Sequence, residues 1–230
     1  LTIVPAGGEA DALAPLPLAL LDLAPAREEI LLRWGLRTIG DLQRLAIEHD
    51  YQLAIQGIGD RAYRELLNIY EAEFAKYPEK TDLRWRIEHA QVIHPDDIPR
   101  FAELGAVANF QPAWAYADDY VVDLTLPFIK PEVAKWMYPI RSVADAGGRL
   151  AFGSDWSVST ADPFYQIEHA VTRVDAETHA TDPLNPEQAI TLEQAIEAFT
   201  MGSAFVNHQE TRTGSVEVGK LADLIVINQN

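Results

Sequence analysis

Residues 51–70 read YQLAIQGIGDRAYRELLNIY and change from a strand pattern to a helix pattern. The apolar run Leu53–Ile55 predicts a short strand, and the segment after Asp60 predicts a helix over 61–76. A strand, a loop and a helix in this order form the repeating unit of α/β proteins with a parallel sheet. The glycines at 57 and 59 match neither nucleotide-binding fingerprint, so a tight turn is the favoured interpretation of this loop.

The same order of strand, loop and helix recurs three times further along the chain. We predict strands over 85–87, 106–110 and 150–152, and helices over 96–104, 132–146 and 163–174. This spacing indicates βαβ units and a parallel sheet. Thr191 and Gln194 indicate a capping box at the start of a helix that runs to about 205. A last strand is predicted over 224–227 from its β-branched composition.

Two short helices are predicted ahead of the first strand. One runs from about Pro25 to Trp34, and the second starts at Thr38 or Asp41. Gly35 lies between them and suits the end of the first helix. The segment therefore reads as a helical hairpin.

The composition excludes several classes of function. The 35 acidic residues outnumber the 18 basic ones, giving a net charge of −17, so binding of nucleic acid through bulk charge is not expected. Cysteine is absent, so any metal would be bound by His, Asp, Glu or carbonyl oxygen. We find no apolar run of about 18 residues and no basic-then-apolar leader, and we therefore expect a cytoplasmic protein without a membrane partner.

Polar residues follow the predicted strands at the point where each strand ends. They are Gln56, His89, Gln111 and Asp155. Reactive side chains of β/α barrels lie at such strand ends. His89 and Asp155 could together hold a divalent cation, or Asp155 could act as general base on a metal-bound water. The alternatives are a core histidine that bonds a carbonyl and an aspartate that caps the following helix.

The other candidate site residues lie in the loops after these strands. The long loop after the third strand carries Trp114, Tyr116, Asp118 and Asp119, and it could line a substrate pocket or be a plain solvated loop. Further candidates for the pocket are Gln111, Asp60, and Trp156, which follows Asp155. Asp60 could orient a site residue or cap its own helix. Gln56 could be a third metal ligand or could bond loop backbone.

Five segments of the chain carry a resemblance to a known family. IGDRA, RIEHAQ, IPRFAELGAVANFQP, GSDW and GKLADLIVI occur in order between about 42 and 227. Together they resemble the amidohydrolase superfamily, in particular its amidohydrolase-3 branch. The resemblance implies an α/β fold that is the C-terminal half of a TIM-like (β/α)8 barrel, with a C-terminal strand of a small β-sandwich. It also implies that a metal-activated water hydrolyses an amide or another non-peptide C–N bond of a small-molecule substrate, with zinc as the expected metal.

The resemblance also implies roles for three residues. His89 matches the metal-binding histidine after strand six of the family, and Asp155 matches the catalytic, metal-contacting aspartate after strand eight. Gln56 stands where the family usually has a histidine after strand five. The paired histidines after strand one and the lysine of strand four have no counterpart, so the metal site of this chain is expected to be incomplete and the metal could be absent.

Residues 1–40 resemble the helical-hairpin region of Y-family, translesion-polymerase-like proteins. We therefore predict three parts: a helical-hairpin segment over 1–41 that could be an unrelated fusion, a partial barrel over 42–210 with strands five to eight, and the accessory strand over 211–230.

Half a barrel exposes sheet edges, so a homo-oligomer is expected. Two functional hypotheses follow: a truncated or fused amidohydrolase, or a catalytically inactive half-barrel that acts as an oligomeric binding or assembly module. A role on DNA is disfavoured by the acidic charge.

Overall fold

The computed structural model describes residues 25–49 and 51–228 of the chain. Their centre is one parallel sheet with the strand order β1-β2-β3-β4, as the sequence predicts. The strands are β1 Ala54–Gly57, β2 Arg86–His89, β3 Val107–Phe110 and β4 Arg149–Phe152. The first strand extends beyond its predicted end at Ile55, because the parallel ladder pairs Gln56 with Glu88 and Gly57 with His89.

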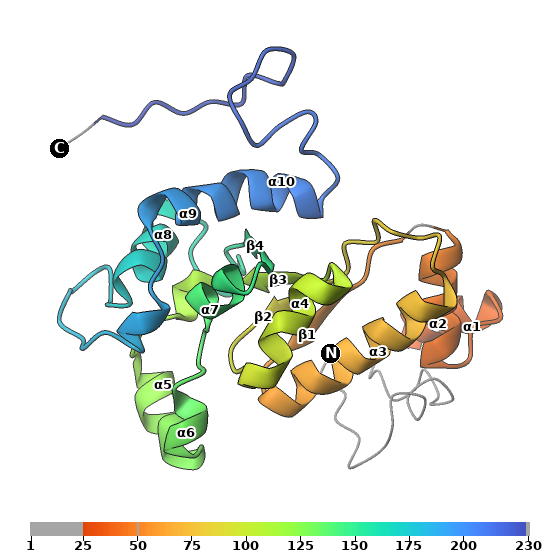
Figure 1. Ribbon diagram of the computed structural model, residues 1–230, viewed down its shortest axis with the longest axis horizontal. Helices are drawn as coiled ribbons and strands as arrows, with labels where there is room; N and C mark the ends of the chain where they lie inside the picture. The colour runs from red at the N-terminus through yellow and green to blue at the C-terminus, as the bar shows by residue number, and fades with distance from the viewer. Residues whose placement is uncertain (1–24, 50, 229–230) are drawn as a thin grey trace.

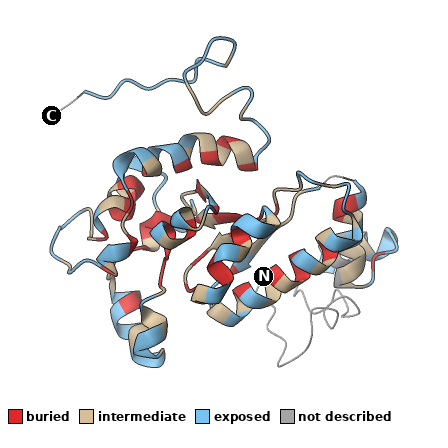
Figure 2. Ribbon diagram, in the orientation of Figure 1, coloured by how far each residue is buried: buried red, intermediate tan, exposed pale blue. Residues whose placement is uncertain are grey.

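Helices cover one face of this sheet (Figure 1). The covering helices are α3 Asp60–Lys76, α4 Ile98–Leu104 and α7 Ile140–Asp145. Alternate strand residues such as Ile87 and Ala108 are fully buried in the same core cluster as Tyr63, Leu67 and Phe101 of the helices. Figure 2 shows this buried layer between the sheet and the helices. The residues in between, such as Glu88, point to the other face of the sheet.

The loop after β1 is a tight turn, as predicted. A Cβ atom on Gly57 would lie 3.2 Å from side-chain atoms of both Ile87 and Tyr63. The hydroxyl of Tyr63 donates a hydrogen bond to the carbonyl of Gly57. Because the glycine is needed for close packing against neighbouring protein atoms, the loop has a structural explanation without a phosphate group.

The two short helices predicted ahead of the first strand are present in the structure. Helix α1 spans Pro25–Arg33 and α2 spans Ile39–Glu48, and Gly35 between them has a φ of 82°. Thr38 caps α2, and Asp41 completes a capping box by accepting from the backbone N–H of Thr38 at 3.0 Å. Residues 1–24, which carry most of the polymerase-like resemblance, lie outside the described residues.

Two helices that were predicted as continuous are interrupted. The segment 132–146 forms α6 Pro131–Ala134 and then α7, and Pro139 at the N-cap of α7 has no N–H for a continuous helix. The segment 191–205 begins with the predicted capping box and forms α9 Leu192–Glu197, a π-helical stretch Ala198–Gly202 and α10 Ser203–Val206. The predicted loop after β3 contains a helix, α5 Asp119–Leu124. The remaining helix is α8 Pro163–Thr172.

The π-helical stretch has a packing cause. Gly202 lies against β4 so closely that a Cβ atom on it would be 2.3 Å from the carbonyl oxygen of Leu150. The hydroxyl of Ser203 donates to the carbonyl of Phe152 at 2.7 Å. The extra residue in the helix turn therefore lets the backbone of this helix rest directly on the last strand.

The predicted strand over 224–227 is not formed. This segment has no regular structure and is exposed, and it leaves the body of the molecule in Figures 1 and 2. Its apolar, β-branched residues favour a strand, but a strand needs a hydrogen-bonding partner, and no other strand of the described part pairs with it. Within residues 25–49 and 51–228, we also find no helix with the length and apolar character needed to cross a lipid bilayer.

Candidate functional site

A cavity of about 210 Å³ lies at the carboxyl ends of the strands. His89 at the end of β2 lines it, together with Asp155 after β4 and Trp114 in the loop after β3. The structure thus brings together three residues that the sequence singled out from segments far apart in the chain. Asp118, another polar lining residue, lies on the loop that the sequence predicted to line a pocket. Sequence reasoning did not assign a site role to the remaining polar lining residues, which are Gln91, Tyr120, Thr125 and Tyr138.

Asp155 is held in a fixed turn beside the cavity. Its carbonyl oxygen accepts from the backbone N–H groups of Val158 at 2.7 Å and Ser159 at 3.1 Å. Its carboxylate oxygen Oδ2 accepts from the indole Nε1 of Trp114 at 3.3 Å. The alternative role as a helix cap is excluded, because Asp162 caps the following helix α8.

His89 is positioned through its backbone. Its N–H donates to Oε1 of Gln111 at 2.9 Å, and Nε2 of Gln111 donates to Glu88 at 3.2 Å. His89 and Asp155 both have left-handed backbone angles, with φ of 72° and 57°. Such angles are uncommon for residues other than glycine and occur frequently at functional sites.

Gln111 does not line the cavity, in contrast to the prediction. It is buried, with 5% of its surface exposed, and connects the backbone of His89 to the carboxylate of Glu88. Its amide is therefore a support for the strand end rather than a contact for a substrate. The physical reason is that it continues the row of β3 side chains that point to the inner face of the sheet.

A polar network on that inner face was missed by the sequence analysis. Arg86 pairs with Glu88 at 2.7 Å and donates to Gln52 at 3.0 Å, while Asn109 donates to the other oxygen of Glu88. The signal was available in the sequence, since Arg86 and Glu88 occupy alternate positions of one strand. The short predicted strands left these residues outside the list of candidates.

Three other predicted site residues lie outside the cavity. Gln56 is exposed in β1, in register with Glu88, and does not line the cavity. Asp60 begins α3 and accepts from the backbone N–H of Arg61 at 2.8 Å, which gives it a role at the helix start. Trp156 is 73% exposed and is not among the lining residues.

Aromatic packing supports the loop that carries Trp114. The ring of Tyr116 stacks on the buried His169 of α8, with 4.2 Å between ring centroids. The His169 ring accepts at Nε2 from the N–H of Ala176 at 3.0 Å, and burial lowers its pKa to about 4. The imidazole is therefore neutral at pH 7, and its flat ring packs against Tyr116 of the loop.

The side chains at the cavity supply two of the atoms that could bind a metal ion. His89 offers a nitrogen and Asp155 an oxygen to the same cavity, but zinc in a catalytic site takes three protein ligands. Among the described residues, no group of three or more His, Asp or Glu side chains could hold a metal. Gln56 does not supply the third ligand, because it lies outside the cavity. The described residues thus provide a partial set that does not by itself fit a zinc ion.

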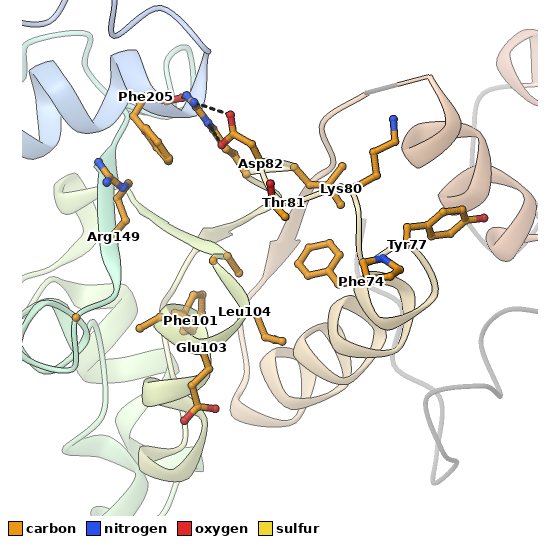
Figure 3. Close-up of a pocket in the computed structure, with 17 residues that line it drawn as sticks. Phe74, Tyr77, Lys80, Thr81, Asp82, Phe101, Glu103, Leu104, Arg149 and Phe205 are labelled. Atoms are coloured by element: carbon orange, nitrogen blue, oxygen red, sulfur yellow. Dashed lines mark hydrogen bonds and ion pairs between the residues drawn. The ribbon is translucent and has the colours of Figure 1, made fainter.

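A second cavity, of about 600 Å³, lies near the opposite end of the strands (Figure 3). Arg84 and Arg149 precede or begin strands there, and each guanidinium carbon lies 3.8 Å from the ring centroid of Phe205. None of the residues that the sequence singled out lines this cavity. Active sites of barrel enzymes lie at the carboxyl ends of the strands, so we assign the candidate site to the smaller cavity.

The structure combines a parallel sheet, helices on one face of it and polar side chains at its carboxyl end. This is the arrangement found in part of a β/α-barrel enzyme. The chain belongs to the amidohydrolase family, whose model matches residues 24–230. The match begins inside the segment 1–41, so helix α1 lies within the family region.

Similar proteins include two curated relatives and a solved structure. The chain is 34% identical over 180 residues to the protein LONG AFTER FAR-RED 3 of Arabidopsis thaliana, covering 78% of this chain and 30% of that protein. It is 30% identical over 192 residues to an N-substituted formamide deformylase of Arthrobacter pascens, covering 84% of this chain and 34% of that enzyme. The chain thus spans about a third of the length of these relatives.

The solved structure is that of an uncharacterized metal-dependent hydrolase of Pyrococcus horikoshii. It is 26% identical to this chain, with a TM-score of 0.67 over 83% of this chain and 37% of that structure. The expected fold, part of a TIM-like barrel, is confirmed by this similarity and by the family match.

Proposed function

We propose that the chain forms part of a hydrolase that cleaves an amide or another non-peptide C–N bond of a small molecule. The observation that carries this proposal is the meeting of His89 and Asp155, from β2 and β4 respectively, at one cavity. The similarity to an N-substituted formamide deformylase supports a C–N bond as the target.

In the proposed reaction, Asp155 accepts the proton of the water that attacks the carbonyl carbon. The carboxylate suits this role because the indole N–H of Trp114 binds one oxygen and leaves the other free for the water. His89 contributes an imidazole to the same cavity. The Gln111 amide keeps its backbone in place.

A divalent metal, zinc, is the proposed cofactor, with His89 and Asp155 as two of its ligands. The metal-dependent hydrolases among the structural neighbours support this assignment. A bound zinc ion polarises a carbonyl and lowers the pKa of a water molecule. Since the described residues provide only two donors, we derive no reaction step through the metal.

The proposal is tested by hydrolysis of an N-alkyl formamide by the purified chain, with and without added zinc, measuring the released amine. We expect activity that Asp155→Asn and His89→Ala each reduce at least about a hundredfold, the range for loss of a general base. Asp119→Asn and His179→Ala are matched controls, because these residues are exposed and do not line the cavity. Activity that survives both site substitutions would contradict the proposal.

A second proposal is that the chain is a catalytically inactive binding or assembly module that forms a homo-oligomer. It is supported by the partial donor set and by the exposure of Leu224, Ile225, Val226 and Ile227, an apolar stretch without a partner strand. Light scattering should then give a molar mass of two or more chains. A monomeric, zinc-dependent hydrolase would exclude this second proposal.

A further inference from the structure

The candidate cavity has an acidic lining. Asp118 and Asp155 both line it, and the lining contains no lysine and no arginine. Three of the other eight lining residues are aromatic, namely Trp114, Tyr120 and Tyr138. A small cavity with carboxylates and aromatic faces is suited to an organic cation, because the ring faces and the carboxylates both attract positive charge.

Asp118 is held beside the cavity at the start of helix α5. Its Oδ1 accepts from the backbone N–H of Val121 at 2.7 Å and so caps α5. Burial raises the pKa of this carboxyl, and the charge of Asp118 in turn contributes to the raised pKa of the Tyr138 hydroxyl. The carboxylate is therefore partly desolvated and close to an aromatic wall of the cavity, whereas the neighbouring Asp119 is exposed.

We propose that Asp118 determines specificity, by binding a protonated amine of the substrate or product against the aromatic lining of the cavity. This inference rests on the proposed function for its link to catalysis. Hydrolysis of an N-substituted formamide consumes one water and yields formate and an amine, which takes up a proton at neutral pH. The same carboxylate would therefore bind the ammonium group of the product, while a substrate with a carboxylate beside the scissile bond would be repelled.

The test measures binding rather than hydrolysis. The full chain, treated with EDTA, is titrated by calorimetry with benzylamine, with its neutral analogue benzyl alcohol and with benzoate. We expect benzylamine to bind about five- to tenfold more tightly than benzyl alcohol, as for one partly buried charge pair, and benzoate to bind most weakly.

Asp118→Asn is the decisive variant, because asparagine caps a helix as well as aspartate does and only the charge is removed. The preference for benzylamine should fall to about onefold in this variant and should be unchanged in Asp119→Asn, which removes the same charge one residue away. Unchanged thermal unfolding of Asp118→Asn confirms that the cap is intact.

Three results would overturn the inference: failure of benzylamine to bind, a preference that survives Asp118→Asn, or a preference that Asp119→Asn abolishes equally. These outcomes are separate from the hydrolase test. A chain that hydrolyses formamides without an amine preference retains the proposed function and loses this inference, and an inactive chain with the preference does the reverse.

Discussion

Replacement of Gly202 by alanine should destabilise the fold through the contact of the π-helical stretch with β4. The added Cβ atom would lie 2.3 Å from the carbonyl oxygen of Leu150 and 3.3 Å from the Cα atom of Ala151. Both are backbone atoms of a strand that pairs with β3, so neither can move without disturbing the ladder. Overpacking of a close-packed interior costs about 1–3 kcal/mol, and a backbone neighbour places this site at the upper end.

A compensating term reduces this value. Alanine favours helical backbone over glycine by about 1 kcal/mol. The net loss in the free energy of unfolding is therefore about 2 kcal/mol, which corresponds to a fall in Tm of about 4–8 °C for a chain of this size. Urea unfolding followed by circular dichroism measures the first quantity and a thermal scan measures the second.

Gly59→Ala is the matched control, because a Cβ atom there meets no heavy atom within 4 Å and the backbone φ is −96°. It should change the free energy of unfolding by less than about 1 kcal/mol. Equal stability of Gly202→Ala and the parent chain would refute the packing explanation for the π-helical stretch.

Three further perturbations test other contacts. Trp114→Phe removes the hydrogen-bond donor to Asp155. Since a hydrogen bond to a charged group is worth about 1.5–3 kcal/mol, kcat should fall at least about tenfold with little change in KM. Steady-state kinetics on the active form measure both constants. Asp41→Ala removes half of a capping box and should lower the free energy of unfolding, measured in urea at pH 7, by about 1 kcal/mol. Backbone N–H donors lower the pKa of Asp41 to about 2, so this stabilisation is present above pH 4 and is lost as the pH falls through 2. The stabilities of variant and parent should therefore converge at that low pH. His169→Phe keeps a flat ring beside Tyr116 and removes an imidazole whose pKa burial lowers to about 4. The parent should lose stability as the pH falls from 6.5 to 4, because the histidine takes up its proton in the unfolded chain first. The variant should lose less stability over the same interval.

The architecture was predictable because it depends on local patterns. The four apolar runs and their spacing predicted the parallel sheet, and the capping box at Thr191 predicted the start of α9. Thr38 was one of two candidates for the start of α2, and the structure selects it. Of the two interrupted helices, one is broken by a local feature, Pro139, and the other by a tertiary contact. Gly202 reads as a weak helix former in the sequence, and only its contact with Leu150 explains the extra residue in that turn.

The candidate site was predictable to the extent that strand ends locate it. His89 and Asp155 were found because each follows an apolar run, and the cavity contains both. Gln56 follows such a run as well, yet β1 extends through it and it stays outside the cavity. Asp118 was predicted only as one of four residues on a loop that could line the pocket, because the course of a loop past the strand ends cannot be read from periodicity.

The backbone angles of His89 and Asp155 determine how substitutions at these two positions change the stability of the chain. A φ of 72° or 57° suits glycine or asparagine better than either native side chain, so His89→Gly and Asp155→Asn should leave the chain as stable as before or more so. At most positions, substitution lowers the melting temperature. A scan that records melting temperature alone would therefore mark these two positions by their unusual tolerance, together with other non-glycine residues of left-handed backbone such as Ala90 and Tyr138.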